Sequence, residues 1–332
     1  MREETLDSAF WSHRPVLVTG ASGHIGGWLV KQLVSLGSDV VCLAREWPPE
    51  CQLVRDGWTP QVKVIQADLC DLDLVQRVLA EHDINTVIHL AAQSIVGTAN
   101  RNPLSTYESN IRGTWCLMEA CRLSGSVKQI LAASTDKVYG ECQELPYTED
   151  MPLRAIYPHD VSKACAEMIA VSYARTYGLN VAITRLPNIY GGADLNWSRI
   201  IPGTIRSILK NEQPVINSNG KFIRDYLYVE DAVAAHLVAV EKLAATPEVS
   251  GEAFNITSEA PMDVLSLVGW ILTLMGSHLE PRVLDQARNE IPNQYMSGAK
   301  ARRMLGWEAA FGLEDGLQRT IEWYRAYLVP KD

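Results

Sequence analysis

The fold of this chain is decided by residues 16–26, which are Val16-Leu17-Val18-Thr19-Gly20-Ala21-Ser22-Gly23-His24-Ile25-Gly26. The first four form a short apolar run typical of a buried parallel strand, and apolar residues recur at helical spacing after Gly26. A strand, a glycine turn and a helix in this order place a pyrophosphate on a helix N-terminus. Gly20 would allow the tight turn, Gly23 the close approach of the pyrophosphate, and Gly26 the packing of helix on strand.

Five more strand patterns follow, separated by helical stretches. This alternation predicts an α/β fold of the Rossmann type, with a doubly wound parallel sheet built by right-handed crossovers. The further strands are predicted at residues 40–44, 62–66, 86–90, 130–133 and 181–185.

The later part of the chain has helical patterns at 231–243, 263–275, 298–305 and 313–327, with short apolar runs between them. We expect 1–186 to be the dinucleotide-binding domain with the catalytic residues. Residues 187–332 should form mainly a smaller C-terminal substrate-binding lobe, with some chain returning to the Rossmann core.

Composition narrows the class of protein. The 332 residues carry a net charge of −9, which argues against nucleic acid as a general partner. No apolar run reaches the ~18 residues of a membrane span, and the polar, acidic start is unlike a signal peptide. Seven cysteines without metal-type spacing suggest reduced thiols in the cytoplasm and no metal site.

The tetrapeptide Ser134-Thr135-Asp136-Lys137 follows a strand pattern, at the end of a strand where this fold carries its chemistry. A carboxylate and an amine beside a hydroxyl add acid and base to a redox site, as elimination of water requires. The pair therefore favours a dehydratase over a plain dehydrogenase or epimerase. The alternative is an exposed turn with a local ion pair.

The glycine spacing, Asp68-Leu69 after the third strand and Leu90-Ala91-Ala92 after the fourth resemble the extended short-chain dehydrogenase/reductase family. The resemblance implies that Asp68 and Leu69 flank an adenine, although Asp68 might instead cap the next helix. The residues expected to contact the cofactor are Gly20, Ser22, Gly23, His24, Ile25, Gly26, Arg45, Asp68, Leu69, Leu90, Ala91, Ala92, Lys163 and Pro187.

The end of the second strand bears on the choice of cofactor. Arg45 would favour the 2′-phosphate of NADP, whereas Glu46 would accept hydrogen bonds from the ribose diol of NAD. We expect NAD, with NADP not excluded, because a dehydratase returns its hydride and needs no reducing pool.

In this family a Tyr-x-x-x-Lys motif supplies a tyrosine base and a lysine that holds the nicotinamide ribose. Here Lys163 has His159 four residues before it, in place of the tyrosine. His159 is a competent base as neutral imidazole, although it is shorter than tyrosine. A second interpretation is that Tyr157 reaches the site, and a third is that the redox step is slowed or lost.

Several further motifs resemble the CDP-glucose 4,6-dehydratases. In that mechanism a hydride passes from sugar carbon 4 to NAD, water is eliminated across carbons 5 and 6, and the hydride returns to carbon 6. Thr135 would hydrogen-bond the sugar hydroxyl, Asp136 would protonate the leaving hydroxyl, and Lys137 would remove the proton beside the ketone. The motifs are Phe10-Trp11, Gly27-Trp28-Leu29, His89-Leu90-Ala91-Ala92-Gln93, Asn102-Pro103-Leu104-Ser105-Thr106-Tyr107, Ser134-Thr135-Asp136-Lys137, Ser162-Lys163-Ala164-Cys165-Ala166-Glu167 and Gly191-Gly192 with Arg199-Ile200-Ile201-Pro202.

The sequence therefore predicts an NAD-dependent nucleotide-sugar 4,6-dehydratase acting on a CDP-glucose-like substrate. Alternatives are a nucleotide-sugar 4-epimerase, which needs neither Asp136 nor Lys137, and a redox-impaired nucleotide-sugar-binding protein. Arginines suit a diphosphate, and the substrate candidates are Gln93, Asn188, Arg199, Arg206 and Arg224.

Two helical patterns, at 104–122 and 161–177, are rich in apolar and small residues. In the family the equivalent helices pair across a two-fold axis. We therefore expect a homodimer through a four-helix bundle, although both helices might simply pack on the sheet.

Overall fold

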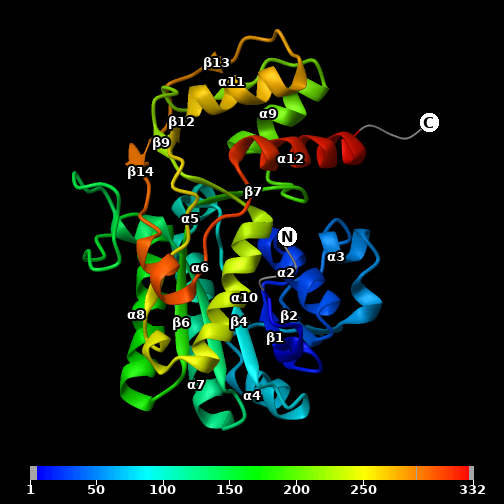
Figure 1. The fold of residues 1–332 in the computed structure, drawn as a ribbon, viewed down its shortest axis with the longest axis vertical. Coiled ribbons are helices and arrows are strands. Elements are labelled where there is room, and N and C mark those ends of the chain that lie inside the picture. Colours follow the sequence, from blue (N-terminus) through cyan, green and yellow to red (C-terminus); the bar gives the residue numbers. More distant parts are fainter. Residues whose placement is uncertain (1–5, 289, 329–332) are drawn as a thin grey trace.

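The computed structural model describes residues 6–288 and 290–328. Its centre is a seven-stranded sheet in the order β11-β6-β5-β4-β1-β2-β3, and every pairing in it is parallel (Figure 1). The predicted Rossmann-type sheet is thus confirmed, and a seventh strand that the sequence patterns did not predict closes one edge. The strands are β1 Pro15–Thr19, β2 Asp39–Ala44, β3 Lys63–Gln66, β4 Thr86–His89, β5 Gln129–Thr135, β6 Val181–Leu186 and β11 Ala253–Asn255.

Helices cover both faces of this sheet, so residues of β1 are buried on either side. Val16 and Val18 enter one hydrophobic core, whereas Leu17 enters the other. The first core is shared with α2 (His24–Ser35) and α10 (Val229–Ala245). The second is shared with α4 (Leu72–Glu81), α7 (Gly113–Ser124) and α8 (Pro158–Tyr177).

Helix α8 begins three residues before the predicted 161–177 stretch. Tyr157 is its extended N-cap residue and Pro158 occupies the first turn, where a missing N–H costs nothing. The helix ends at Gly178, which has a left-handed φ of 70°. The earlier start puts His159 in the first turn and Lys163 one turn later, on the same helix face.

The predicted 104–122 helix is broken into three pieces. Asn102 caps α6 (Pro103–Tyr107) by accepting a hydrogen bond from the Ser105 N–H (3.2 Å). A π-helical segment η3 (Glu108–Arg112) then leads into α7. Single π-helical turns are frequent at functional sites, and this one carries Asn110, which is bonded to α8.

The remaining chain forms a lobe beyond the carboxyl ends of the strands, where Figure 1 shows α9, α11 and α12 together. These three helices share a core of their own. The chain returns from this lobe to the sheet as α10 and β11. The lobe elements are β7 Asn188–Tyr190, α9 Ile200–Leu209, β8 Val215–Ile216, β9 Ile223–Arg224, β10 Tyr226–Tyr228, β12 Met262–Asp263, α11 Val264–Met275, β13 Arg282–Val283, β14 Asn293–Gln294 and α12 Leu313–Leu328.

The predicted helix at 298–305 is a π-helical turn, η6 (Ala301–Leu305), ended by Gly306 in a left-handed conformation. Within residues 6–288 and 290–328, no helix has the length and apolar character to cross a membrane. The other short helical segments are α1 Ser8–Trp11, α3 Gln52–Arg55, η2 Thr59–Gln61, α5 Val96–Arg101, η4 Asp136–Tyr139 and η5 Pro247–Val249.

Candidate active site

A cavity of about 1350 Å³ lies between the carboxyl ends of the strands and the lobe. This is the place where open α/β sheets bind ligands. Every cofactor-binding and substrate-binding residue predicted from the sequence lies in its wall. So do Thr135, Lys137, His159 and Lys163, whereas Asp136 lies behind the wall.

The glycine turn builds one side of this cavity from backbone. Gly20 has φ +76°, and a Cβ there would lie 2.7 Å from the Ala91 nitrogen. A Cβ on Gly26 would overlap the Gly20 carbonyl, whereas one on Gly23 would meet only that carbonyl, at 3.2 Å. Gly23 is the N-cap residue of α2, where no side chain covers the helix N-terminus. The open N-terminus and close glycine packing fit the pyrophosphate of a dinucleotide.

His24 connects this turn to the lobe through a hydrogen bond with the Gly192 carbonyl. Its Nε2 lies 3.2 Å from the Gly192 carbonyl oxygen, and the Trp28 indole N–H donates to the same oxygen (2.9 Å). Burial lowers the pKa of His24 to about 4, so the ring is neutral near pH 7. A neutral His24 can donate from Nε2 to the carbonyl without placing a cation in the cavity.

The end of β5 carries the Thr135-Asp136-Lys137 group. The Thr135 hydroxyl donates to Asp136 Oδ1 (3.0 Å) and accepts from the Lys137 N–H (3.4 Å). Asp136 is 1% exposed, and its Oδ2 has no hydrogen-bond partner among the described residues. A buried acceptor without a partner is costly. Asp136 is therefore unlike a solvated turn acid: it is buried directly behind the cavity wall, next to Thr135 and Lys137, which line the cavity.

Gln294 is a site residue that was not predicted from the sequence. Its Oε1 accepts a hydrogen bond from Lys137 Nζ (3.1 Å), and its own Nε2 has no partner among the described residues. Gln294 lies on β14, which pairs with β9. Because 157 residues separate it from Lys137, no local pattern points to it.

The first turns of α8 place His159, Asp160 and Lys163 in the cavity wall. Lys163 Nζ donates to the Ala133 carbonyl (2.7 Å) at the end of β5. Burial lowers the pKa of Lys163 to about 8, although the nearby Glu167 carboxylate acts in the opposite direction. His159 Nδ1 lies 3.0 Å from Asp160 Oδ1. Tyr157 also lines the cavity, as the cap of the same helix.

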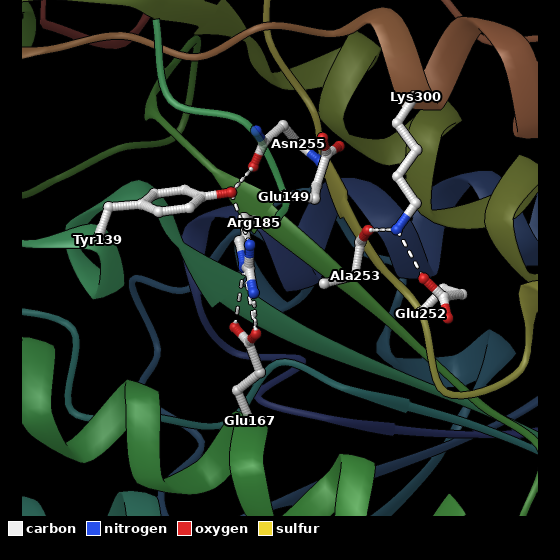
Figure 2. A network of polar contacts seen from close by, with 8 residues as sticks. All are labelled: Tyr139, Glu149, Glu167, Arg185, Glu252, Ala253, Asn255 and Lys300. Carbon is white, nitrogen blue, oxygen red and sulfur yellow. Dashed lines mark hydrogen bonds and ion pairs between the residues drawn. The ribbon is translucent and has the colours of Figure 1, made fainter. Parts of the chain in front are cut away.

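A buried network fixes α8 against the sheet (Figure 2). Arg185 Nε donates to both carboxylate oxygens of Glu167 (3.1 and 3.2 Å), one turn beyond Lys163. Arg185 Nη1 donates to the Tyr139 hydroxyl (2.6 Å), which donates to Asn255 Oδ1 (2.7 Å). The network joins α8, β6, η4 and β11, so the end of β5 and the start of α8 share one support.

Figure 2 also shows a second group of contacts, made by Lys300 with Glu252 and Ala253. Lys300 Nζ donates to Glu252 Oε2 (2.7 Å) and to the Ala253 carbonyl (2.9 Å). Arg175 Nη2, on α8, donates to the other Glu252 oxygen (2.8 Å). These contacts connect the start of β11 to α8 and to Lys300.

Asn110 links three cavity-forming segments. Its Oδ1 accepts from the Gln93 N–H (2.7 Å), and its Nδ2 donates to the Gln93 carbonyl (3.2 Å) and the Ser162 hydroxyl (2.8 Å). The Ser162 hydroxyl donates in turn to the His159 carbonyl (2.6 Å). The π-helical turn thereby holds the Gln93 loop against the first turn of α8.

The three candidate arginines line the lobe side of the cavity. Arg224 is buried and donates from Nη1 to the Ile223 and Pro292 carbonyls (2.9 and 2.8 Å). Arg199 pairs with Asp194 (2.9 Å), and Arg206 lies over the Trp197 ring (4.7 Å). The guanidinium groups of these three arginines make this side of the cavity suited to an anion.

Comparison with known proteins gives one family match. Residues 16–257 match the model of the NAD dependent epimerase/dehydratase family. The span covers the whole of the sheet and the cavity residues up to β11. It therefore includes the glycine turn, the end of β5 and the start of α8.

Individual relatives divide between dehydratases and epimerases. The CDP-glucose 4,6-dehydratase of Salmonella typhimurium is 28% identical, with 98% of this chain and 95% of that protein covered. A crystal structure of the UDP-glucose 4-epimerase of Thermotoga maritima with UDP-glucose superposes with a TM-score of 0.88 at 29% identity. It covers 95% of this chain and 99% of that one.

A longer relative is the Arabidopsis thaliana trifunctional UDP-glucose 4,6-dehydratase/UDP-4-keto-6-deoxy-D-glucose 3,5-epimerase/UDP-4-keto-L-rhamnose-reductase. It is 29% identical over 327 residues, which are 96% of this chain. The chain spans about half of that protein, 48% of its length. The match thus corresponds to one part of a multifunctional protein.

Proposed function

This chain belongs to the NAD dependent epimerase/dehydratase family, and on that ground we propose that it acts as a nucleotide-sugar 4,6-dehydratase. It is an enzyme of the nucleotide-sugar dehydratase and epimerase kind, and its cofactor is NAD, the cofactor expected from the sequence. The proposed substrate is a CDP-glucose-like nucleotide sugar, and the product is its 4-keto-6-deoxy derivative.

The observation that carries this proposal is the buried Asp136 beside Lys137 at the end of β5. A 4-epimerase needs only oxidation and reduction at carbon 4, so it has no use for a second acid and base. The partnerless Oδ2 of Asp136 and the Lys137 amine provide that pair next to the Thr135 hydroxyl. Their proximity supports elimination of water after oxidation.

The steps can be assigned to residues of this chain. Bound NAD supplies a hydride acceptor for carbon 4 and a hydride donor for carbon 6. Thr135 binds the carbon 4 hydroxyl and His159 takes its proton. Lys137 then removes the proton from carbon 5, and Asp136 donates a proton to the departing carbon 6 hydroxyl, which leaves as water. Lys163 holds the nicotinamide ribose in this scheme.

A screen of CDP-, UDP- and dTDP-glucose with mass spectrometry tests the proposal. We expect at least one substrate to lose one water and to gain a 4-keto group. An epimer without loss of water would identify a 4-epimerase, the candidate that the likeness to the Thermotoga maritima enzyme favours. Binding without turnover would identify the redox-impaired protein.

Asp136→Asn separates the two chemistries. It keeps the shape of the side chain but removes the acid, so elimination should slow while hydrogen exchange at carbon 4 continues. Unchanged turnover in this variant would mean that Asp136 has no part in catalysis.

We further propose a homodimer through α6, α7 and α8. Leu104 is 70% exposed, Met168 is 62% exposed, and Trp115 is also exposed on the intervening helix. Exposed large apolar side chains of this kind are typical of association surfaces when they form a patch. Sedimentation should give twice the monomer mass of 36.8 kDa, and Leu104→Asp with Met168→Asp should give the monomer. A wild-type monomer at micromolar concentration would contradict the dimer.

The proposed location is the cytoplasm. All seven cysteines are free thiols in the structure, and such thiols persist in reducing compartments. Cell fractionation tests this, and recovery of the protein outside the cytoplasm would contradict it.

A further inference from the structure

The His159–Asp160 pair has the form of an imidazole held by a carboxylate. His159 Nδ1 and Asp160 Oδ1 are 3.0 Å apart, and the two side chains are only 6% and 5% exposed. Both residues line the cavity, on the first turn of α8. The contact is therefore shielded from solvent and adjacent to the place where a sugar would be oxidised.

The hydrogen bond between His159 and Asp160 selects one tautomer of the imidazole. An ionised carboxylate can only accept a hydrogen bond, so Nδ1 of His159 must carry the proton. In a neutral imidazole the other nitrogen, Nε2, is then the acceptor. A carboxylate in this position also stabilises the imidazolium that forms when Nε2 takes a proton.

We propose that Asp160 is a positioning residue that fixes His159 as the base for oxidation of the sugar hydroxyl. The His159–Asp160 pair thus replaces the tyrosine that resemblance to the family would place at position 159. This inference deepens the proposed function but needs only its first step, oxidation at carbon 4. It supplies a group that holds the orientation of the shorter side chain at position 159.

The surrounding hydrogen bonds support this role. The His159 carbonyl accepts from Ser162, which accepts from Asn110, so the backbone of the first turn is held in place. Lys163 is turned toward the Ala133 carbonyl at the end of β5. Asp160 is therefore the side chain that the structure records in contact with the His159 ring.

If Asp160 only stabilises the N-terminus of α8, we expect a different result. Asp160 is the third residue of α8, where a carboxylate stabilises a helix N-terminus. That stabilisation would be the same whichever side chain stands at position 159. The two roles are therefore distinguished by changing both residues.

The experiment is a double-mutant cycle of Asp160→Asn in the wild-type and His159→Tyr backgrounds. The probes are CDP-6-deoxyglucose and UDP-6-deoxyglucose, which lack the carbon 6 leaving group, so NAD reduction reports oxidation alone. In the wild-type background, Asp160→Asn should slow NAD reduction by roughly 100-fold or more. In the His159→Tyr background, the same change should alter the rate by less than about 3-fold.

Controls separate folding from catalysis. Asp71 caps α4 by accepting from the Leu74 N–H (3.1 Å), and it does not line the cavity. Asp71→Asn should leave the oxidation rate unchanged, and Asp160→Glu should recover part of the rate lost in Asp160→Asn. Thermal unfolding and NAD affinity, measured on each variant, identify any protein that has failed to fold.

Two outcomes would overturn the inference. Equal losses in both backgrounds would assign Asp160 to the helix terminus. Absence of NAD reduction in the wild type, with gain of it in His159→Tyr, would show that His159 is not a working base. If the coupling is found but CDP-glucose and its analogues lose no water, the dehydratase proposal fails and the role of Asp160 stands.

Discussion

The cavity has two walls that are built by different means. Around Gly20, Gly23 and Gly26 the surface is backbone, and the contacts that require glycine come from within the turn or from the neighbouring strand. Around the end of β5 and the start of α8 the surface is side chains, and several of the contacts that support it come from residues far away along the chain. A backbone wall depends on a local pattern, whereas a side-chain wall depends on the assembled fold.

Removing Arg185 should break the side-chain wall most severely. Arg185→Met leaves the buried Glu167 carboxylate without its partner, so the free energy of unfolding should fall by about 3–5 kcal/mol. The matched control is Arg175→Met, because Arg175 is 63% exposed in its pair with Glu252 and should cost less than about 1 kcal/mol. Urea unfolding measures both, and equal losses would mean that the buried network does not support this wall.

Gly23→Val should damage the backbone wall without unfolding it. Gly23 has an ordinary φ of −81°, and an added Cβ meets only the Gly20 carbonyl. The branched side chain would occupy the space that a pyrophosphate needs, so NAD affinity should fall by roughly 100-fold, about 2.7 kcal/mol. Calorimetric titration measures this loss.

Gly26→Val is the contrast to Gly23→Val, since a Cβ on Gly26 overlaps backbone and should destabilise the turn itself. An unchanged NAD affinity in Gly23→Val would show that the turn does not hold the cofactor.

Lys163 belongs to the side-chain wall and should make the free energy of unfolding depend on pH. Burial lowers its pKa from 10.5 to about 8, so the unfolded chain binds the proton up to higher pH than the folded one. The cost of the buried cation is therefore complete below pH 8 and disappears as pH rises toward 10.5. At pH 7, Lys163→Met should stabilise the cofactor-free protein by roughly 2 kcal/mol, after about 1 kcal/mol for the lost hydrogen bond.

Denaturant unfolding at pH 7, 8, 9 and 10 checks the Lys163 prediction. The difference in the free energy of unfolding between wild type and Lys163→Met should become smaller as the pH rises through this range. If the difference in the free energy of unfolding is the same at every pH, the charged form of Lys163 does not destabilise the folded protein.

Gln294→Leu should have the smallest effect and should concern the side-chain wall alone. It removes the acceptor for Lys137 Nζ, so elimination should slow about 10-fold, equivalent to about 1.4 kcal/mol. NAD affinity and reduction by 6-deoxy analogues should not change. A loss of NAD affinity as large as that in Gly23→Val would place Gln294 in the support of both walls.

The difference between the walls also explains how much was predictable from the sequence. The sheet and the glycine turn follow from strand runs and glycine spacing, which are local, and the strand at 253–255 was missed because only three residues form it. Thr135 and Lys137, which line the cavity, could be selected from the sequence because they lie at the carboxyl end of a strand pattern. Gln294 and Asn255 could not, since their roles arise from contacts across more than 100 residues. Asp160 could have been proposed from the sequence, because it directly follows His159 and a carboxylate beside a histidine is a recognisable pattern.

The late return of the chain to the sheet as β11 has a consequence for making hybrids of related enzymes. The chain leaves the sheet after β6, builds α9 and the first short strands of the lobe, and comes back at Ala253–Asn255 before leaving again toward Gln294. A single crossover near residue 187 would therefore exchange the lobe together with one edge strand and the Asn255 contact to Tyr139. A graft of substrate preference from a relative needs at least two junctions, one on each side of α10 and β11.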